Sequence, residues 1–353
     1  MKLSFLGDIS LNDDYIQLKK ANAKPFDNII SYLKDSNFVI GNLECLSIGN
    51  NGENELKKPR LKTTIDTLNY LNDIQLDLAL LAHNHVYDNL YDGFTKTIDF
   101  LEENKIKYIG AGTSREDAAK PFIELVEDKK ICILNYVSKD TNPNIPDDAD
   151  IYVNWYDIQN VITDIKTYRT DVDYIIVCLH WGGRYEGGLY PDWALIEQSY
   201  LIIDAGADLI IGGHSHTLQP MQKYKNKSIY YSLGNFCFSD IVFEGEKFPN
   251  DNPNRQESLI VEVCLKDKYY DINHIPIKFP NLMHQEDQDV LRRWKIRNRI
   301  FKLMSKFPFI WKIYSKYFNY AKPLLRYISR KDRNIIEKIK HINPDKIKRF
   351  IGK

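Results

Sequence analysis

Five of the eight histidines stand in three short clusters, and one cluster offers two imidazoles separated by a single residue. These are His214 and His216, in the stretch LIIGGHSHTLQ that runs from Leu209 to Gln219. A run of branched apolar residues that ends in two glycines predicts a buried strand followed by a tight turn. Imidazole is the commonest side-chain ligand of protein-bound metals. The stretch therefore predicts a metal site at the carboxyl end of a strand.

Polar residues also follow several other apolar runs of the chain. They are Asp8, Asn42, Glu44, Asn84, His85 and His180. Oxygen and imidazole donors without thiolates suit Zn, Mn or Fe, and a carboxylate among them can bridge two ions. Such a site performs metal-assisted hydrolysis, in which cations acidify a water and stabilise charge on a phosphoryl or acyl oxygen. A histidine outside the ligand set can protonate the leaving group.

Each of these residues also has a structural interpretation when it is taken alone. An aspartate or asparagine after a strand commonly forms a hydrogen-bonded turn, which fits Asp8, Asn42 and Asn84. A histidine such as His180 can be a hydrogen-bonded core residue. The grouping of all these residues at predicted strand ends favours a functional site over separate structural explanations.

The elements that must position these residues are strands that alternate with helices. Apolar runs predict strands over residues 2–7, 37–43, 76–82, 107–109, 130–137, 172–179, 208–211, 228–233, 259–265 and 272–277. Helical spacing predicts helices over residues 25–35, 64–72, 92–103, 155–168 and 192–205, and residues 50–58 are expected to form a polar surface loop. This alternation predicts an α/β domain with helices on both faces of its sheets. In open α/β sheets, ligands collect at the carboxyl ends of the strands, where these polar residues stand.

The order of the motifs resembles that of the bacterial capsule synthesis protein CapA family. The motifs are Gly7-Asp8-Ile9, Asn42-Leu43-Glu44, Ala82-His83-Asn84-His85 with Asp88, His180-Trp181-Gly182, Gly213-His214-Ser215-His216 and Tyr231 to Phe236. The resemblance covers residues 2 to 265. The family is associated with poly-γ-glutamate and other capsule production, and it is similar to calcineurin-like metallophosphoesterases. It implies a sandwich of two mixed sheets flanked by helices (αββα), with a centre for two divalent metal ions between them.

The resemblance also implies roles for individual residues. The expected metal ligands are Asp8, Glu44, Asn84, His180, His214 and His216, with Glu44 as the bridging carboxylate. His85, with Asp88 beside it in the motif, is expected to assist the departing oxygen, and Arg60 to bind an anionic group of the substrate. The chain departs from the family pattern at Ser10, His83, Arg184 and Ser215, the last of which stands where the family usually has proline. We expect His83, Arg184 and the nearby Glu186 to bind substrate, and an additional metal ligand at His83 stays open.

Two functions follow from this resemblance. The first is a metal-dependent, phosphoesterase-like hydrolase that acts in capsule or exopolymer production on an anionic polymer or a phosphorylated substrate. The second is a non-catalytic, metal-binding assembly or export factor for the capsule polymer. Turnover of a generic phosphoester with added Mn²⁺ separates them.

The charge of the chain is zero overall but is unevenly distributed. Residues 291–353 hold 20 Lys and Arg against 3 Asp and Glu, whereas residues 1–290 hold 28 and 45. Aromatic residues alternate with these basic ones, and Pro308, Pro323 and Pro344 divide the segment into short helices. The pattern predicts a basic helical tail, residues 289–353, appended to a domain of residues 1–288. Three partners stay open for this tail: an anionic membrane surface, the acidic body or a protein partner, and nucleic acid, which is not expected because no nucleic-acid module precedes it.

The remaining composition favours a cytoplasmic protein with peripheral contact at the inner face of the membrane. The five cysteines form no CxxC pair, which is typical of reduced, buried thiols. The sequence MKLSFLGDIS becomes polar after six residues, so it does not resemble a signal peptide. No apolar run approaches the length that spans a bilayer.

Overall fold

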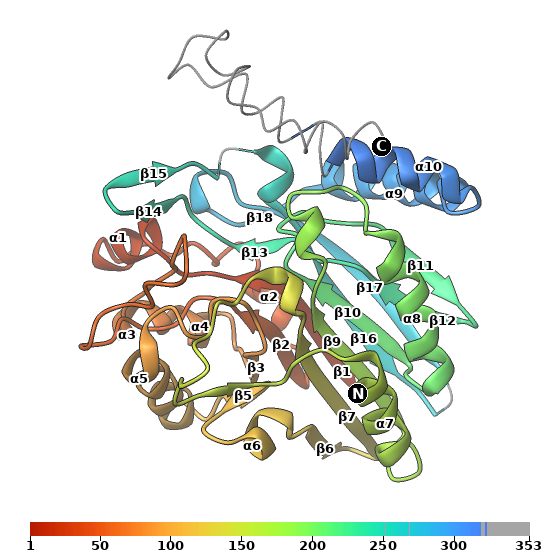
Figure 1. Ribbon diagram of the computed structural model, residues 1–353, viewed down its shortest axis with the longest axis horizontal. Helices are drawn as coiled ribbons and strands as arrows, with labels where there is room; N and C mark the ends of the chain where they lie inside the picture. Colours follow the sequence, from red (N-terminus) through yellow and green to blue (C-terminus); the bar gives the residue numbers. More distant parts are fainter. Residues whose placement is uncertain (251, 268, 319–321, 323–353) are drawn as a thin grey trace, which may run out of the picture.

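Two mixed β-sheets form the centre of the protein (Figure 1). The computed structural model describes residues 1–250, 252–267, 269–318 and 322. The first sheet has the strand order β18 (Gln285–Glu286), β17 (Tyr270–Lys278), β16 (Glu257–Leu265), β1 (Lys2–Ile9), β2 (Phe38–Leu43), β3 (Leu78–Leu80) and β4 (Lys107–Ile109), with β13 (Asn235–Cys237) paired to β1. The second has the order β11 (Met221–Tyr224), β12 (Lys227–Tyr230), β10 (Leu209–Gly213), β9 (Tyr174–His180), β7 (Lys129–Val137) and β6 (Phe122–Val126). Short pairs are formed by β14 (Ile241–Phe243) with β15 (Glu246–Phe248), and by β5 (Ala111–Gly112) with β8 (Tyr152–Val153).

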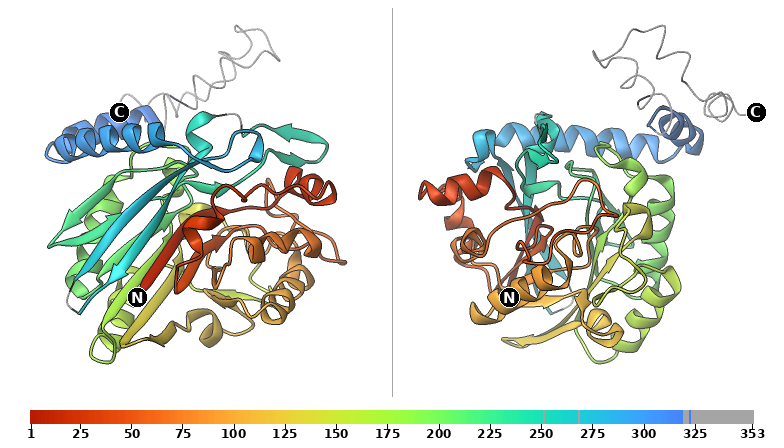
Figure 2. Two further views of the ribbon diagram at one scale, coloured as in Figure 1. Left: turned by 180° about the vertical axis from the view of Figure 1, so that it is seen from behind. Right: turned by 60° about the vertical axis from the view of Figure 1, so that its left-hand side comes forward.

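Helices cover the outer faces of the two sheets, as the two views of Figure 2 show. On the side of the first sheet lie α1 (Asp14–Lys20), α2 (Ile30–Leu33), α3 (Ile65–Leu68), α4 (Tyr70–Asp73) and α5 (Leu90–Glu103), with α6 (Arg115–Ala119) near its edge. On the side of the second sheet lie α7 (Ile158–Tyr168) and α8 (Trp193–Ala205). The last two helices are α9 (Gln288–Met304) and α10 (Pro308–Lys316). This arrangement confirms the predicted α/β sandwich of two mixed sheets flanked by helices.

Three apolar layers hold these elements together. The central layer joins the inner faces of the sheets, with Leu3 and Phe5 of β1 against Ile176 of β9 and Ile211 of β10. The outer layers lie beneath the helices on each side, and fully buried residues such as Phe26 and Ile165 belong to them. Strands that are buried on both faces read as continuous apolar runs, which explains why the sequence pattern predicted them.

One predicted helix is much shorter in the structure than its spacing suggested. Over residues 25–35, only α2 is helical, although Phe26, Ile29 and Leu33 are buried as a helical face would be. In a longer helix the Pro25 carbonyl would accept the N–H of Ile29. Here that carbonyl accepts the N–H of His284 at 2.8 Å, and the Ile29 N–H turns to the Phe26 carbonyl. A hydrogen bond from distant sequence therefore replaces the first helical turn.

The predicted tail begins with helices that pack on the body of the protein. Val290 and Trp294 of α9 belong to the central apolar layer, and Phe301 of α9 and Trp311 of α10 belong to the layer over the second sheet. The indole N–H of Trp294 donates to the Gln219 carbonyl at 2.9 Å. The boundary at residue 288 stays a prediction, and residues 319–321 and 323–353 of the expected tail lie outside the described residues. In the described part of the chain, no helix combines the length and the apolar character needed to cross a bilayer.

The docking of α9 predicts a large loss of stability for Trp294→Ala. The side chain is 3% exposed and its removal leaves a cavity between the sheets and α9, so we expect the free energy of unfolding to fall by about 3–5 kcal/mol. Leu303→Ala on the same helix is the matched control, because Leu303 is 63% exposed and its loss should change stability by less than about 0.5 kcal/mol. Urea unfolding of both variants tests this. Equal midpoints would show that α9 does not contribute to the fold.

Candidate metal centre

The candidate site lies where the carboxyl ends of four parallel strands meet. In the first sheet β1 and β2 are parallel neighbours, with Asp8 opposite Asn42. In the second sheet β9 and β10 are parallel neighbours, with His180 opposite Gly213. Because the two sheets pack face to face, the residues that follow these strands meet at one end of the sandwich. The predicted strand-end residues therefore converge from both sheets.

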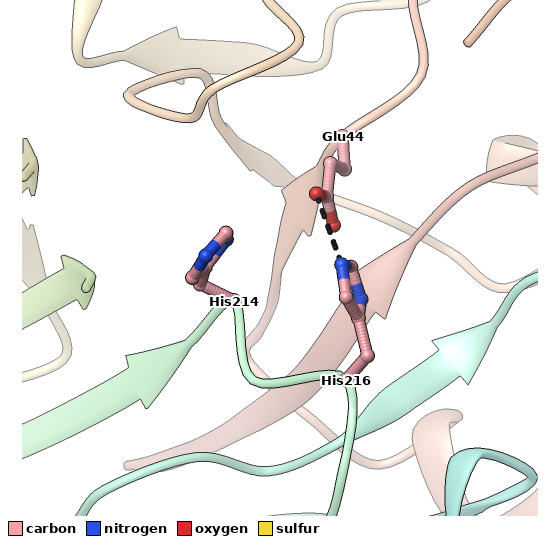
Figure 3. A group of neighbouring side chains, drawn as sticks. All are labelled: Glu44, His214 and His216. Atoms are coloured by element: carbon pink, nitrogen blue, oxygen red, sulfur yellow. Dashed lines mark ion pairs between the residues drawn. The ribbon is translucent and has the colours of Figure 1, made fainter. Parts of the chain in front are cut away.

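The Glu44 carboxylate is the centre of this group. It is fully buried, and neither of its oxygens has a hydrogen-bond partner. Its Oε1 atom lies 3.7 Å from His180 Nε2, 3.8 Å from His216 Nε2 and 4.0 Å from His85 Nε2. Donor atoms of Glu44, His214 and His216 all lie within 4.8 Å of one another (Figure 3). These separations are too long for hydrogen bonds and suit ligands on a common cation, since bonds of about 2.0–2.2 Å place two ligands on one ion about 3–4 Å apart.

A second set of close donors surrounds His180. Its Nε2 atom lies 2.8 Å from Asn84 Oδ1 and 3.1 Å from His214 Nδ1, and its Nδ1 atom lies 3.2 Å from the side-chain nitrogen of Asn42. Asn84, His180, His214 and Glu44 thus form one group. Asp8 and His216 form another group: Asp8 Oδ2 lies 3.6 Å from His216 Nδ1, and His216 Nε2 lies 3.8 Å from Glu44, which thus adjoins both groups.

The backbone around the paired histidines has an uncommon conformation. His214 and His216 both have positive φ, 78° and 55°, which is costly for residues other than glycine. The N–H of His214 donates to Asp8 Oδ2 at 3.0 Å and holds the turn against β1. His216 Nδ1 lies 2.9 Å from Asn235 Oδ1, which accepts its proton and leaves Nε2 directed at Glu44. Strain and side-chain orientation together indicate that the turn is built to aim the two imidazoles.

The protonation of these side chains fits a site for a divalent cation. Burial, together with the nearby Asp8, raises the pKa of Glu44 well above its usual range. Burial lowers the pKa of His180 well below its usual range and that of His214 to about 3, so both imidazoles are neutral and can coordinate. A buried carboxylate without a partner is costly, and a bound cation removes that cost. The residues present therefore fit the predicted metal.

This protonation predicts that metal affinity rises with pH. Because the pKa of Glu44 is raised, the metal-free site still holds a proton at pH values where a free glutamate is ionised, and metal binding must release it. We expect the affinity for Mn²⁺ to rise by up to about tenfold per pH unit below the folded pKa of Glu44 and to level off above it. Calorimetric titration at pH 6 and pH 8, in buffers of different ionisation enthalpy, measures both affinity and proton release. An affinity that does not change with pH, with no proton released, would contradict this.

His85 and Asp88 form a buried pair beside the Glu44 carboxylate. His85 Nδ1 lies 2.6 Å from Asp88 Oδ2, which also accepts the Leu61 N–H at 2.6 Å. Asp88 therefore fixes the His85 ring with its Nε2 atom facing Glu44. Burial lowers the pKa of His85 well below its usual range, so the ring is neutral in the metal-free protein, with its proton on Nδ1 toward Asp88. The pair has the geometry of an imidazole oriented by a carboxylate.

The residues predicted to bind substrate lie in different surroundings, and their roles stay predictions. Arg60 donates to Glu53 at 2.7 Å, and its guanidinium lies over the Phe243 ring. His83 is fully buried, and its Nδ1 accepts the N–H of His85. Glu186 pairs with Arg255 at 3.0 Å. The backbone of Arg184 belongs to the short helix of residues 183–185, and its side chain lies outside the described part of the structure.

Two residues of the site were not predicted from the sequence. Asn235 orients His216, as described above. Lys57 is 4% exposed and donates to the Asn142 carbonyl at 2.7 Å, and its ammonium acts electrostatically on Glu44, His85 and Asp88.

The prediction that residues 50–58 form a polar surface loop is wrong at Asn54 and Lys57, which are buried. Asn54 donates to the Asn144 carbonyl, and its own carbonyl accepts from Arg60, so these contacts draw the loop inward.

Comparison of the sequence with known proteins gives one family and several relatives. The family described as bacterial capsule synthesis protein PGA_cap matches residues 2–240. The chain is 28% identical over 253 residues to the PGA biosynthesis protein CapA of Bacillus subtilis (strain 168), which covers 67% of this chain and 63% of that relative. It is 27% identical over 225 residues to the capsule biosynthesis protein CapA of Bacillus anthracis, covering 60% of this chain and 53% of that relative. The aligned part thus spans between half and two thirds of the length of these relatives.

Solved structures resemble the fold more distantly. The calcineurin-like phosphoesterase YfkN from Bacillus subtilis aligns with 90% of this chain and 98% of its own, at 15% sequence identity and a TM-score of 0.43.

Proposed function

The chain belongs to the bacterial capsule synthesis protein family, and from that membership we propose that it is a metal-dependent, phosphoesterase-like hydrolase. Its substrate would be an anionic polymer or a phosphorylated compound used in making a capsule or another exopolymer. The observation that carries the proposal is the buried, unpartnered Glu44 carboxylate, with three imidazole nitrogens at 3.7–4.0 Å.

Each residue of the site has a part in this proposal. Asn84, His180 and His214 would hold one ion and Asp8 with His216 a second, and Glu44 would bridge them. Divalent ions such as Mn, Zn or Fe, when bound, supply the positive charge that acidifies water and offsets negative charge on a phosphoryl oxygen. Asn235 holds His216 in the tautomer that leaves Nε2 free. The buried Lys57 adds positive charge beside the site, which favours an anionic substrate.

Proton transfer in this proposal depends on His85 and Asp88. Asp88 accepts the hydrogen bond from His85 Nδ1 and fixes the ring, so that Nε2 can hold a proton for the departing oxygen. Because burial lowers the pKa of the imidazole, Nε2 would take up this proton from the attacking water during the reaction and release it readily to the departing oxygen. His85 is thus proposed as the general acid and Asp88 as the residue that positions it.

The test is turnover by the purified full-length chain. With Mn²⁺ added, bis(p-nitrophenyl) phosphate or p-nitrophenyl phosphate should be hydrolysed, a chelator should stop the reaction and Mn²⁺ should restore it. His214→Ala should remove both metal and activity, whereas His274→Ala should keep both, because His274 pairs with Tyr230 away from the site. A folded, metal-loaded protein that cleaves neither ester nor a wider panel of phosphoesters would overturn the hydrolase proposal. That result would favour the non-catalytic assembly or export factor.

A further inference from the structure

We propose that the outer face of α9 and α10 is a docking surface for an anionic lipid bilayer. Seven of the nineteen exposed large hydrophobic side chains in the described part of the chain lie between residues 296 and 317. They are Ile296, Ile300, Leu303, Phe307, Phe309, Ile313 and Tyr317. Contiguous exposed apolar residues on a folded protein mark an interaction surface. This property is independent of the hydrolase activity proposed above.

The apolar residues form one stripe on each helix. On α9, Ile296, Ile300 and Leu303 are four and three residues apart, which places them on one face. The buried face of the same helix carries Trp294 and Phe301. On α10, Phe309 and Ile313 are likewise exposed, whereas Trp311 is 2% exposed. Each helix therefore has two apolar faces, one packed on the body and one facing outward.

Basic residues lie directly beside the apolar stripes. The exposed ones are Arg292, Lys295, Arg299, Lys302, Lys306, Lys312 and Lys316. Residues 290–318 contain no aspartate or glutamate. The remaining two basic residues of this segment, Arg293 and Arg297, point inward and pair with Glu257 at 2.7 and 3.4 Å. The chain thus balances its inner basic residues with a carboxylate and leaves the outer ones as a positive surface.

The body of the protein holds this surface in place. Arg297 donates to the Leu218 carbonyl at 2.8 Å, and Trp311 donates to the Pro191 carbonyl at 3.2 Å. Tyr314 stacks on Tyr185, with ring centroids 5.6 Å apart. Both helices lie together at one end of the molecule (Figures 1 and 2). The face is therefore a fixed part of the fold, available without a folding step.

The composition of the face favours a bilayer over the other anionic partners. An anionic polymer would be bound by the lysines alone and would leave Leu303, Phe309 and Ile313, which are 61–63% exposed, in water. At a bilayer interface, apolar side chains enter the boundary between headgroups and acyl chains while neighbouring basic side chains contact anionic headgroups. Both sets of residues are then used, as in interfacial amphipathic helices.

Vesicle flotation with the full-length protein tests the surface. Wild type should float with vesicles of phosphatidylcholine and phosphatidylglycerol and stay at the bottom with phosphatidylcholine alone. The variant Lys302→Gln/Lys306→Gln/Lys312→Gln should lower the partition coefficient about 100-fold. The variant Leu303→Ser/Phe309→Ser/Ile313→Ser should also fail to float, although its charge is unchanged. Leu125→Ser is the matched control, because Leu125 is 65% exposed on β6 and its variant should float as wild type does.

Three results would overturn the proposal. One is a wild-type protein that stays at the bottom with both kinds of vesicle. Another is an apolar triple variant that floats as wild type does, which would make the face a site for polyanions. The third concerns the oligomeric state. If wild type is a dimer that does not float, and the apolar substitutions convert it to a monomer, the face is a contact between copies of the chain. Melting temperatures close to that of wild type establish that each variant is folded.

Discussion

The Glu44→Gln protein is expected to lose its stabilisation by metal while melting at a higher temperature than wild type when both are metal free. Burial raises the pKa of Glu44, so this group contributes stability below its unfolded pKa and loses it as pH rises through its folded pKa. At pH values above the unfolded pKa, burial of this carboxyl group therefore opposes folding of the metal-free protein, because the group must either take up a proton or be buried with its charge. Glutamine keeps the shape without the charge, but it cannot replace a bridging carboxylate.

The effect of metal on wild type should be large enough to measure directly. A ligand at 100 times its Kd adds about 2.7 kcal/mol to the free energy of unfolding, which for a chain of this size raises Tm by about 4 °C. Differential scanning calorimetry with Mn²⁺ or a chelator should show this rise in wild type and its absence in Glu44→Gln. Glu262→Gln is the control. Glu262 is a largely buried carboxylate on β16 that pairs with Lys2 at 2.8 Å, and its variant should keep the metal-dependent rise in Tm. A Glu44→Gln protein with the full metal-dependent rise would show that the ion lies elsewhere.

The His85→Asn protein is expected to keep its metal and lose most of its activity. Asn removes the imidazole that would deliver a proton to the departing oxygen, while the six proposed ligands remain. General acid catalysis typically contributes about 10²–10⁴-fold, so kcat for a phosphoester with a poor leaving group should fall by about that factor. For p-nitrophenyl phosphate, whose leaving group p-nitrophenolate is stable without a proton, kcat should fall much less. The measurements are kcat for both substrates and the metal content of the variant. Together they separate the role of His85 in proton transfer from any role in metal binding.

Asp88→Asn provides the companion variant. It weakens the orientation of His85 without removing the imidazole, so its kcat should lie between those of wild type and His85→Asn. His274→Asn, outside the site, should leave kcat unchanged. If His85→Asn loses its metal and its kcat falls equally for both substrates, His85 acts as a metal ligand and its assignment as general acid is wrong.

The fold and the convergence of the strand-end residues were predictable from the sequence for a physical reason. Strands buried on both faces are continuous apolar runs, and their ends are marked where polar residues begin. Asp8, His180 and His214 stand at such ends; parallel pairing aligns the strand ends within each sheet, and face-to-face packing of the two sheets brings Asp8 to the histidines. The family resemblance supplied what the pattern could not, namely the expected role of each residue.

Other features depend on contacts that no local pattern contains. The burial of Lys57 arises from the Asn142 carbonyl, 85 residues away, and the short α2 from the N–H of His284. The docking of α9 also could not be read from its basic composition, because Trp294 and Arg297 find partners in the turn around Gln219. Sequence spacing identifies which face of a segment is apolar, but not which distant element will cover it.

The placement of the proposed metal centre between two sheets also determines when it could form during synthesis. Asp8 and Glu44 are made early, His180 follows near the middle of the sequence and His214 and His216 after it, and the closing strands β16 and β17 come later still. Contacts of such long sequence separation form late and slowly. A nascent chain therefore has no complete set of ligands, and loading with metal must follow the meeting of the sheets. If the proposed ligands hold the metal, newly made protein should therefore gain metal only as its molecules complete folding.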